Sequence, residues 1–418
     1  MSGIHEKAPE GAPREAVLIL GGGLTGGALA LALASGGIPS VVIDAAPRAR
    51  HFEEAFDGRA SAAAAGSKRL LEVLGVWGGM AGEVQPIDDI LVTEGRVSEG
   101  SFAHFLHFDH RETGRGPFGW LTENRHLRRE IRRRLEEEPL ITLVDETRVG
   151  DLTSGPAEAE ALATDGRRWR GALAVICEGR GSSTAETAGF RYARWSYDQT
   201  GLVATIRHER PHEGVAHEYF LPSGPFAVLP LTGNRSSLVW TEKPEPARAV
   251  MAAGEDAFLR EVRRRMGGML GELELEGPRW SYPLSFSLAY DYVKPRLALL
   301  GDSAHAVHPI AGQGLNLGFR DVAALAEVLT EALRRGEDIG ALDVLERYQR
   351  RRRFDNAAMG LGMDAMNRLF SNDSAILRAV RGFGLSAVEK LAPLKRRFMA
   401  QAAGEMGDLP RLLRGEPL

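Results

Sequence analysis

The stretch "AVLILGGGLTGGALALALASGGIPSVVID", residues 16–44, decides the fold. It holds a short apolar run, a glycine-rich turn, a segment of small apolar residues, and a second apolar run that ends in Asp44. A short apolar run is typical of a strand buried on both faces, and Gly36 and Gly37 are placed to end a helix. The pattern predicts a β-α-β unit with parallel strands, and so an α/β protein (α+β overall) with a Rossmann-like domain.

The first turn of this unit has glycine at three positions that suit a dinucleotide: Gly21, Gly23 and Gly26. The first glycine permits a tight turn, the second lets the backbone approach a pyrophosphate, and the third lets helix and strand pack closely. The helix N-terminus would then face the phosphates, and Asp44 would accept hydrogen bonds from ribose hydroxyls. A glycine-rich turn without a ligand is the alternative, but the position between strand and helix favours a nucleotide.

Composition bounds the class of protein. The chain has 418 residues, of which 44% are hydrophobic and 26% charged, and its net charge is −4, which suits a soluble protein of two or three domains without a nucleic-acid partner. Cys177 is the single cysteine, which excludes an internal disulfide and a cysteine zinc site and fits the cytoplasm. Residues 1–15 are expected to be a flexible leader. Glycines interrupt the most apolar stretch, so we expect no membrane span, while contact with a membrane surface stays open.

The rest of the chain predicts further elements and a domain division. Apolar strands near 172–177 and 296–300 fit the first sheet, and helices are expected at 123–139 and 317–336, the former with a solvated arginine face. Strands broken by Pro, Gly and Asn between 192 and 290 predict an inserted β-rich domain. We expect a discontinuous cofactor domain at 16–80, 120–185 and 292–350, a β-rich substrate domain at 81–119 and 186–291, and a helical C-terminal region at 351–418. Three methionines in that region, Met359, Met363 and Met366, are interpreted as core filler or a partner face rather than a cofactor contact.

A second glycine-rich stretch, "GDSAHAVHPIAGQGLN" at residues 301–316, allows two interpretations. Asp302, His305 and His308 are the ligand types of a metal site, but that site would leave the glycines unexplained. A flavin cradle explains the glycines, because glycine lets backbone N–H groups approach a flat ring, and a helix N-terminus stabilises negative charge on that ring. It also explains Asp302, as an acceptor for hydroxyl groups of the cofactor. We therefore expect no metal, a structural role for the two histidines, and Asn316 as a helix-capping residue.

Taken together, these motifs resemble the aromatic-hydroxylating flavoprotein monooxygenases, the group that contains para-hydroxybenzoate hydroxylase. "GGGLTGG", "CEGRGSS" and "GDSAHAVHPIAGQGLN" match its three motifs in order, with Glu178 where the family has aspartate. Within the group, "WLTENRHLRR", "GPFAVLPL" and "HPIAGQGLNLGFRD" are most similar to the ubiquinone-biosynthesis hydroxylases that act on octaprenylated phenols.

The resemblance implies FAD as cofactor and assigns residues to it. The implied contacts are Gly21, Gly23, Gly26, Asp44, Arg59, Arg125, Glu178, Gly179, Asp302, Gly312, Gly314, Leu315 and Asn316. Pro309 would sit above the flavin beside the substrate. From the residues alone, Arg59 is equally well interpreted as a solvated surface charge.

The resemblance also implies a reaction. NAD(P)H would reduce the flavin, O2 would form its C4a-hydroperoxide, and the oxygen would pass to a polyprenylated phenol. The expected location is the cytoplasm, with membership of a quinone-biosynthesis complex and peripheral contact with the inner membrane as further expectations. Two alternatives stay open: a flavin enzyme of another type, such as a prenyl reductase or a halogenase, and an idle flavoprotein subunit of a biosynthetic complex.

Overall fold

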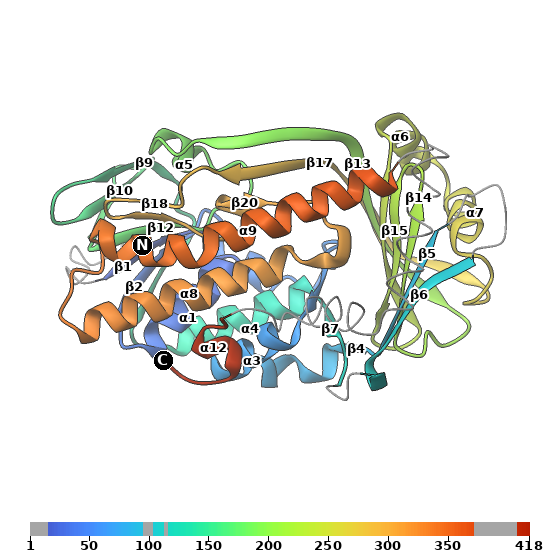
Figure 1. Cartoon of the computed structure of the whole chain (residues 1–418), viewed down its shortest axis with the longest axis horizontal. Coiled ribbons are helices and arrows are strands. Elements are labelled where there is room, and N and C mark those ends of the chain that lie inside the picture. Colours follow the sequence, from blue (N-terminus) through green and yellow to red (C-terminus); the bar gives the residue numbers. More distant parts are fainter. Residues whose placement is uncertain (1–15, 95–102, 113–115, 372–407) are drawn as a thin grey trace, which may run out of the picture.

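The computed structural model describes residues 16–94, 103–112, 116–371 and 408–418. The expected leader at 1–15 and much of the C-terminal region therefore lie outside the described residues. Figure 1 shows two sheets toward opposite ends of the long axis, with two long strands running between them.

The first sheet is the one that the opening stretch predicts. Its six strands lie in the order β18-β19-β12-β1-β2-β8 and are parallel except for β18. They span Val293–Lys294, Leu297–Leu299, Leu173–Ile176, Val17–Leu20, Ser40–Ile43 and Ile141–Val144. The three strands expected from apolar runs around residues 16, 40 and 172 are confirmed, because side chains buried on both faces leave no polar alternation.

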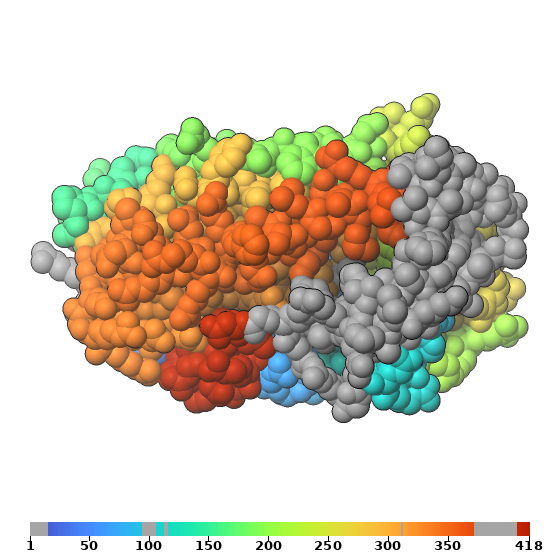
Figure 2. Space-filling view, in the orientation of Figure 1, coloured from blue at the N-terminus to red at the C-terminus, as the bar shows by residue number. Residues whose placement is uncertain are grey.

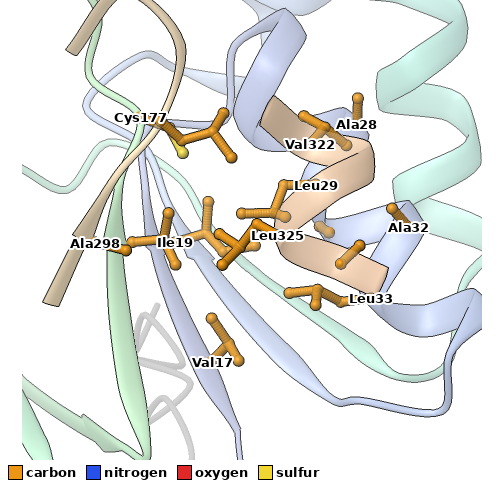
Figure 3. Close-up of a cluster of buried hydrophobic side chains, with 14 of the residues drawn as sticks. Val17, Ile19, Ala28, Leu29, Ala32, Leu33, Cys177, Ala298, Val322 and Leu325 are labelled. Carbon is orange, nitrogen blue, oxygen red and sulfur yellow. The ribbon is translucent and has the colours of Figure 1, made fainter. Parts of the chain in front are cut away.

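Three long helices pack together on this sheet: α1 (Leu24–Ser35), α8 (Gly314–Arg334) and α9 (Leu342–Phe370). Figure 3 shows side chains of β1 meeting those of α1 and α8, among them Ile19, Leu29 and Leu325. Because α8 lies between α1 and α9 (Figure 1), most of its surface is buried. We expected α8 to bury one apolar face only, but residues on most of its sides are buried. Leu333, which we expected on the buried face, is 37% exposed.

Helix α4 (Asn124–Glu137) corrects another expectation. Its arginine run is not wholly a solvated face, since Arg132 is buried and donates to both carboxylate oxygens of Asp145 at 2.6 and 2.7 Å. Burial of a guanidinium is tolerated here because it forms a bidentate ion pair. Shorter helices lie nearby: α2 (Arg48–His51), α3 (Ala65–Val73), α5 (Ser183–Thr187) and the 3-10 turn Trp77–Glu83.

Two small antiparallel sheets adjoin the first one. One is a meander that the sequence did not predict, formed by β9 (Val149–Ser154), β10 (Ala159–Ala163) and β11 (Arg168–Gly171). The other has the order β3-β7-β4 and joins Ala60–Ala63, Gly119–Glu123 and Gln85–Ile87. It pairs segments that we had divided between the cofactor domain and the substrate domain, and the division itself stays a prediction.

The strand-rich segment expected between residues 192 and 290 forms most of an eight-stranded sheet in the order β20-β17-β13-β16-β15-β14-β5-β6. These strands span His305–Ala306, Leu273–Ala289, Tyr192–His208, Arg235–Glu242, Gly224–Leu231, Val215–Leu221, Asp89–Glu94 and Ala103–Asp109. Helices α6 (Pro244–Ala252) and α7 (Glu255–Met266) pack near one another, and their side chains join a core with Phe226 and Trp240.

The end of the chain packs against the first half of the molecule. Leu412 and Leu413 in α12 (Arg411–Arg414) are buried, and the Leu413 carbonyl accepts a hydrogen bond of 2.7 Å from Arg69 of α3. In Figure 2 this segment, in red, lies against the orange helices. The described end of the chain is therefore fixed to α3 and α8.

Candidate active site

The glycine-rich turn after β1 has the geometry that its sequence predicts. Gly21 has a φ of +99°, and a Cβ atom there would lie 2.7 Å from the carbonyl oxygen of Cys177. At Gly26 a Cβ atom would lie 1.9 Å from the carbonyl oxygen of Gly21, so a side chain would push α1 away from the turn. A Cβ atom on Gly23 would meet nothing within 4 Å, because this residue faces a large cavity. The backbone here is therefore open to a ligand, as a pyrophosphate requires.

Asp44 reaches back from the end of β2 to this turn. One carboxylate oxygen accepts a hydrogen bond from the Gly22 N–H at 2.6 Å, and the other accepts one from Ala46 at 2.7 Å. Asp44 also lines the cavity. It braces the glycine turn, and its contact with a ribose stays a prediction.

Two other turns converge beside the first. Ser303, in the 3-10 turn Gly301–Ser303 after β19, accepts a hydrogen bond from the Gly179 N–H at 3.0 Å and donates one to the Gly179 carbonyl at 3.2 Å. The turn after β12 is tightened further, because the hydroxyls of Ser182 and Thr184 donate to Glu178 at 2.7 and 3.2 Å. Strand ends far apart in the sequence therefore form one edge, where α/β sheets bind their ligands.

The third turn rests on a buried ionic cluster that the sequence did not reveal. Asp321 of α8 is fully buried and accepts hydrogen bonds from the N–H of Gly301 at 3.2 Å, from Arg352 at 2.7 Å and from Asn356 at 3.0 Å. His305 Nε2 lies 2.5 Å from the same carboxylate. Burial alone would raise the pKa of Asp321, but the charges of His305 and Arg352 hold it well below its usual range.

The histidines of this stretch have the structural surroundings that we expected. His305 contacts Asp321, and His308 Nδ1 accepts a hydrogen bond from the Ile310 N–H at 3.2 Å. Burial lowers the pKa of His308 to about 4, so its ring is neutral near neutral pH. The described parts of the chain hold no group of three His, Cys, Asp or Glu side chains arranged to bind a metal.

Asn316 does not cap its helix, which corrects the sequence interpretation. Helix α8 begins at Gly314, and the Asn316 side chain turns away to α3, where its oxygen accepts from the Ala64 N–H at 2.9 Å and from the Ser67 hydroxyl at 2.7 Å. Its amide donates to the Ala62 carbonyl at 3.0 Å. Asn316 lies in the first turn of α8, so its side chain joins the N-termini of α8 and α3 at the cavity wall.

Most of the remaining predicted contacts line the cavity: Glu178, Gly179, Asp302, Pro309, Gly312, Gly314 and Leu315. Gly312 and Gly314 leave open space where a Cβ atom would stand, which suits a flat ring lying against the backbone.

The two arginines differ from one another. Arg59 lines the cavity but is largely exposed and pairs with Asp57 at 3.1 Å. Arg125 does not line the cavity; it pairs with the buried Glu123 at 2.7 Å and also donates to the Glu54 carbonyl. Gly26 is likewise outside the lining, as its packing role requires.

One cavity of about 1530 Å³ joins the three turns to the eight-stranded sheet. On the sheet side its lining is mostly apolar and includes Val92, Leu106, Phe220 and Leu229. Met359, Met363 and Met366 of α9 also line it, so the interpretation as core filler is incomplete: Met363 is buried in a core cluster, and all three face the cavity.

Sequence reasoning missed one titratable residue on this apolar wall, Glu218 of β14. Burial raises the pKa of its carboxyl to about 8. The alternation in "VAHEYFL" places Glu218 on the same face as Ala216 and Phe220, so an acid between two apolar residues was the available signal.

Comparison with known proteins agrees with this geometry. The FAD binding domain family matches residues 14–359. The ubiquinone hydroxylase UbiL of Rhodospirillum rubrum is 46% identical over 405 residues, which cover 96% of this chain and 93% of that protein. The 3-demethoxyubiquinol 3-hydroxylase of Escherichia coli is 35% identical over 93% of this chain and 98% of its own length.

The chain belongs to the FAD-dependent ubiquinone-biosynthesis hydroxylases. FAD is its cofactor, and the open glycine turns fit that group. Among solved structures, p-nitrophenol 4-monooxygenase from Pseudomonas putida superposes with a TM-score of 0.76 at 17% identity, covering 94% of this chain and 99% of that one. HpxO of Klebsiella pneumoniae, solved with FAD and uric acid, gives 0.72 at 17% identity and covers 96% and 97%. At this identity the likeness shows the fold alone.

Proposed function

We propose that this enzyme hydroxylates the aromatic ring of a polyprenylated phenol on the route to ubiquinone, with NAD(P)H as reductant and O2 as oxygen donor. One observation carries the proposal: a single cavity connects the nucleotide-binding turns to a mostly apolar sheet wall. A phenol with a long isoprenoid chain needs both an apolar enclosure and access to a flavin.

At the turn end, the residues of this chain would hold the cofactor. Gly23 and the N-terminus of α1 offer backbone N–H groups to the pyrophosphate, and Asp44 and Asp302 offer carboxylate oxygens to hydroxyls. Gly314, at the start of α8, presents the positive end of a helix dipole to the ring. When bound, FAD supplies the redox chemistry that accepts hydride and activates O2.

At the wall end, the side chains would orient the phenol and exclude water. Pro309 lines the cavity at the start of the turn Ile310–Gly312, which suits a residue that sets the ring against the flavin. Val92, Leu106 and Phe220 are buried in the described core and offer no hydrogen bonds to water. A dry site protects reactive oxygen species from unproductive release.

The test is oxygen incorporation by purified holoprotein. With NAD(P)H, isotopically labelled O2 and a prenylated phenol, we expect one labelled oxygen atom in the product, found by mass spectrometry. The same material must consume NAD(P)H faster when phenol is present. Reduction of O2 to hydrogen peroxide with no labelled product would contradict the proposal.

The same measurements separate the alternatives. A prenyl reductase would return a product without added oxygen, and an idle subunit would keep its flavin oxidised when NAD(P)H is added. A strain that lacks the protein should accumulate the phenolic precursor, whose structure identifies the ring carbon that is hydroxylated.

We also propose that the enzyme acts in the cytoplasm in contact with the inner membrane and with a quinone-biosynthesis complex, because its substrate is lipid-like. Within the residues that the structure describes, no helix combines the length and apolar character that a membrane span requires. Among the exposed apolar side chains of helix α9, Phe354 at 81% and Leu361 at 50% are the most exposed, and they lie two turns apart on one face. Flotation with anionic vesicles should fall when both are changed to serine, and unchanged flotation would contradict this route of contact.

A further inference from the structure

The apolar wall of the cavity contains one carboxyl group whose surroundings are fixed by strand register. On β14, Ala216, Glu218 and Phe220 line the cavity together with His217, whereas Tyr219 packs on Phe226 in the core on the other side of the sheet. Glu218 therefore projects from the cavity face of the strand.

The neighbouring strands surround this carboxyl with apolar side chains. Val92 of β5 lies opposite it on one side, and Ala227 of β15 lies opposite it on the other. The row continues through Val239 of β16 and Val203 of β13, which also line the cavity. A carboxyl at this position has no cross-strand group that could satisfy it.

On β5, β6, β15 and α9, the described side chains that share the cavity with Glu218 are apolar, and His217 is the titratable group next to it on its own strand. His217, its neighbour on β14, also lines the cavity and stacks on Tyr219, with ring centroids 6.1 Å apart. Within the described chain the carboxyl makes no hydrogen bond or ion pair with another side chain.

Glu218 is half-buried, and a carboxyl that faces an apolar cavity without a partner is costly and calls for an explanation. Burial raises the pKa of this carboxyl to about 8, so the neutral acid predominates at neutral pH. A neutral carboxylic acid donates one hydrogen bond and accepts others, which is the complement of a phenol hydroxyl. A bound phenol would therefore supply the partners that the protein does not.

We propose that the Glu218 carboxyl is the polar anchor for the phenolic oxygen of the substrate. Its O–H donates to that oxygen and its carbonyl accepts the phenol hydrogen, while the apolar row holds the ring and the first isoprene units. The proposal rests on the function proposed above and names the residue that orients the ring. No bond is broken in this step, and the group acts by positioning.

The test uses FAD-loaded enzyme titrated with a soluble short-chain prenylated phenol, whose binding is followed by the change in flavin absorbance. Glu218→Met keeps the length of the side chain and removes its polarity, and we expect it to raise the Kd and KM for the phenol about tenfold. Glu218→Gln keeps a donor and an acceptor, so its Kd should stay within about threefold of wild type. Glu274→Gln, on an exposed site of β17 in the same sheet, is the matched control and should bind as wild type does.

A pH series distinguishes an anchor from a residue that only supports the strand. Wild-type binding should weaken as the pH rises above 8, because the carboxyl loses the proton that it donates. The glutamine variant should show no such decline, since its amide donates at every pH tested.

Each result decides the proposal. If wild type hydroxylates the phenol and Glu218→Met binds it equally well, Glu218 is not the anchor and the proposed function stands. If the wild-type holoenzyme binds no phenol, both proposals are wrong. If Glu218→Met fails to fold, Glu218→Gln provides the test. Phenol binding by Glu218→Gln that still weakens above pH 8 would show that Glu218 is not the anchor.

Discussion

The two ends of the cavity are built in different ways. At the turn end, the shape is set by side chains that are missing: a Cβ atom on Gly21 or Gly26 would lie 2.7 or 1.9 Å from a backbone oxygen. At the wall end, the shape is set by side chains that alternate along paired strands, such as Glu218 between Val92 and Ala227. The first end presents open backbone and has little room for change, whereas the second can be altered one side chain at a time.

This difference accords with the division of labour in a flavin hydroxylase. A cofactor common to many enzymes needs only one cradle, and backbone N–H groups provide it whatever the substrate. A substrate that varies from enzyme to enzyme needs a surface whose chemistry can change without disturbing the cradle. We therefore expect substitutions at the turn end to affect folding or FAD retention, and substitutions at the wall end to affect the phenol.

The largest effect should come from Asp321, which supports the turn end from below. Asp321→Ala would leave Arg352 buried without its main counter-ion, and breaking a buried ion pair in this way costs about 3–5 kcal/mol. Chemical unfolding should show this loss of free energy, together with weaker FAD retention, since the Gly301 N–H loses its acceptor.

Asp355→Ala is the matched control for that variant. Asp355 contacts the same arginine at 2.6 Å, but its side chain is 40% exposed. Water can replace it there, so the loss should be about 1 kcal/mol or less. Equal losses from the two aspartates would show that burial of the cluster does not set its energy.

A smaller effect is expected at the glycine turn, where two neighbouring glycines should separate folding from binding. Gly26→Ala forces α1 away from the turn and should cost about 1–3 kcal/mol of unfolding free energy. Gly23→Ala adds a methyl group where the described chain leaves open space, so the apoprotein should be nearly as stable as wild type while FAD binds more weakly. Tight FAD binding by Gly23→Ala would contradict the placement of the pyrophosphate at this residue.

The contrast between the two ends also explains what the sequence could predict. The turn end was predictable because its signals are local: Gly21, Gly23 and Gly26 lie within six residues, and Asp302 lies in the turn just after an apolar strand. Ser303, which joins two turns, was not predictable, because a serine in a loop has no pattern that reveals its partner 124 residues away. The contacts between this chain and FAD stay predictions for every assigned residue.

Errors arose where tertiary packing changed the meaning of a local pattern. Asparagine is a residue type that often caps helices, but Asn316 lies inside α8 and hydrogen-bonds to the start of α3 instead. Arg132 belongs to a charged run but pairs with Asp145 on the inward side of its helix. Glu218 escaped notice in part because one of its apolar neighbours, Val92 of β5, lies more than a hundred residues earlier, in a parallel pairing that no hairpin signal predicts.

His308, buried beside the cavity-lining Pro309, should make stability depend on pH. Burial holds its pKa near 4, below the value of about 6.5 expected in the unfolded chain. The unfolded state therefore takes up the proton first as the pH falls, so stability is complete above about pH 6.5 and declines toward pH 4. From pH 7 to pH 5 this residue should account for a loss of about 2 kcal/mol, which His308→Phe should remove. An equal decline in the variant would assign the pH dependence to other groups.

The smallest effect on stability should come from the wall, where Ala227→Leu tests the other half of the comparison. Ala227 lines the cavity opposite Glu218, so the added methyl groups enter open space and should change the unfolding free energy by only about 0.5 kcal/mol. The same substitution at Ala204, whose side chain packs in the core with Trp240, should cost about 1–3 kcal/mol. FAD retention should be normal in Ala227→Leu, and its KM should rise more for a phenol with a bulky prenyl group than for unsubstituted phenol. If FAD were lost instead, the wall would be part of the cofactor cradle, and the two ends could not be altered independently.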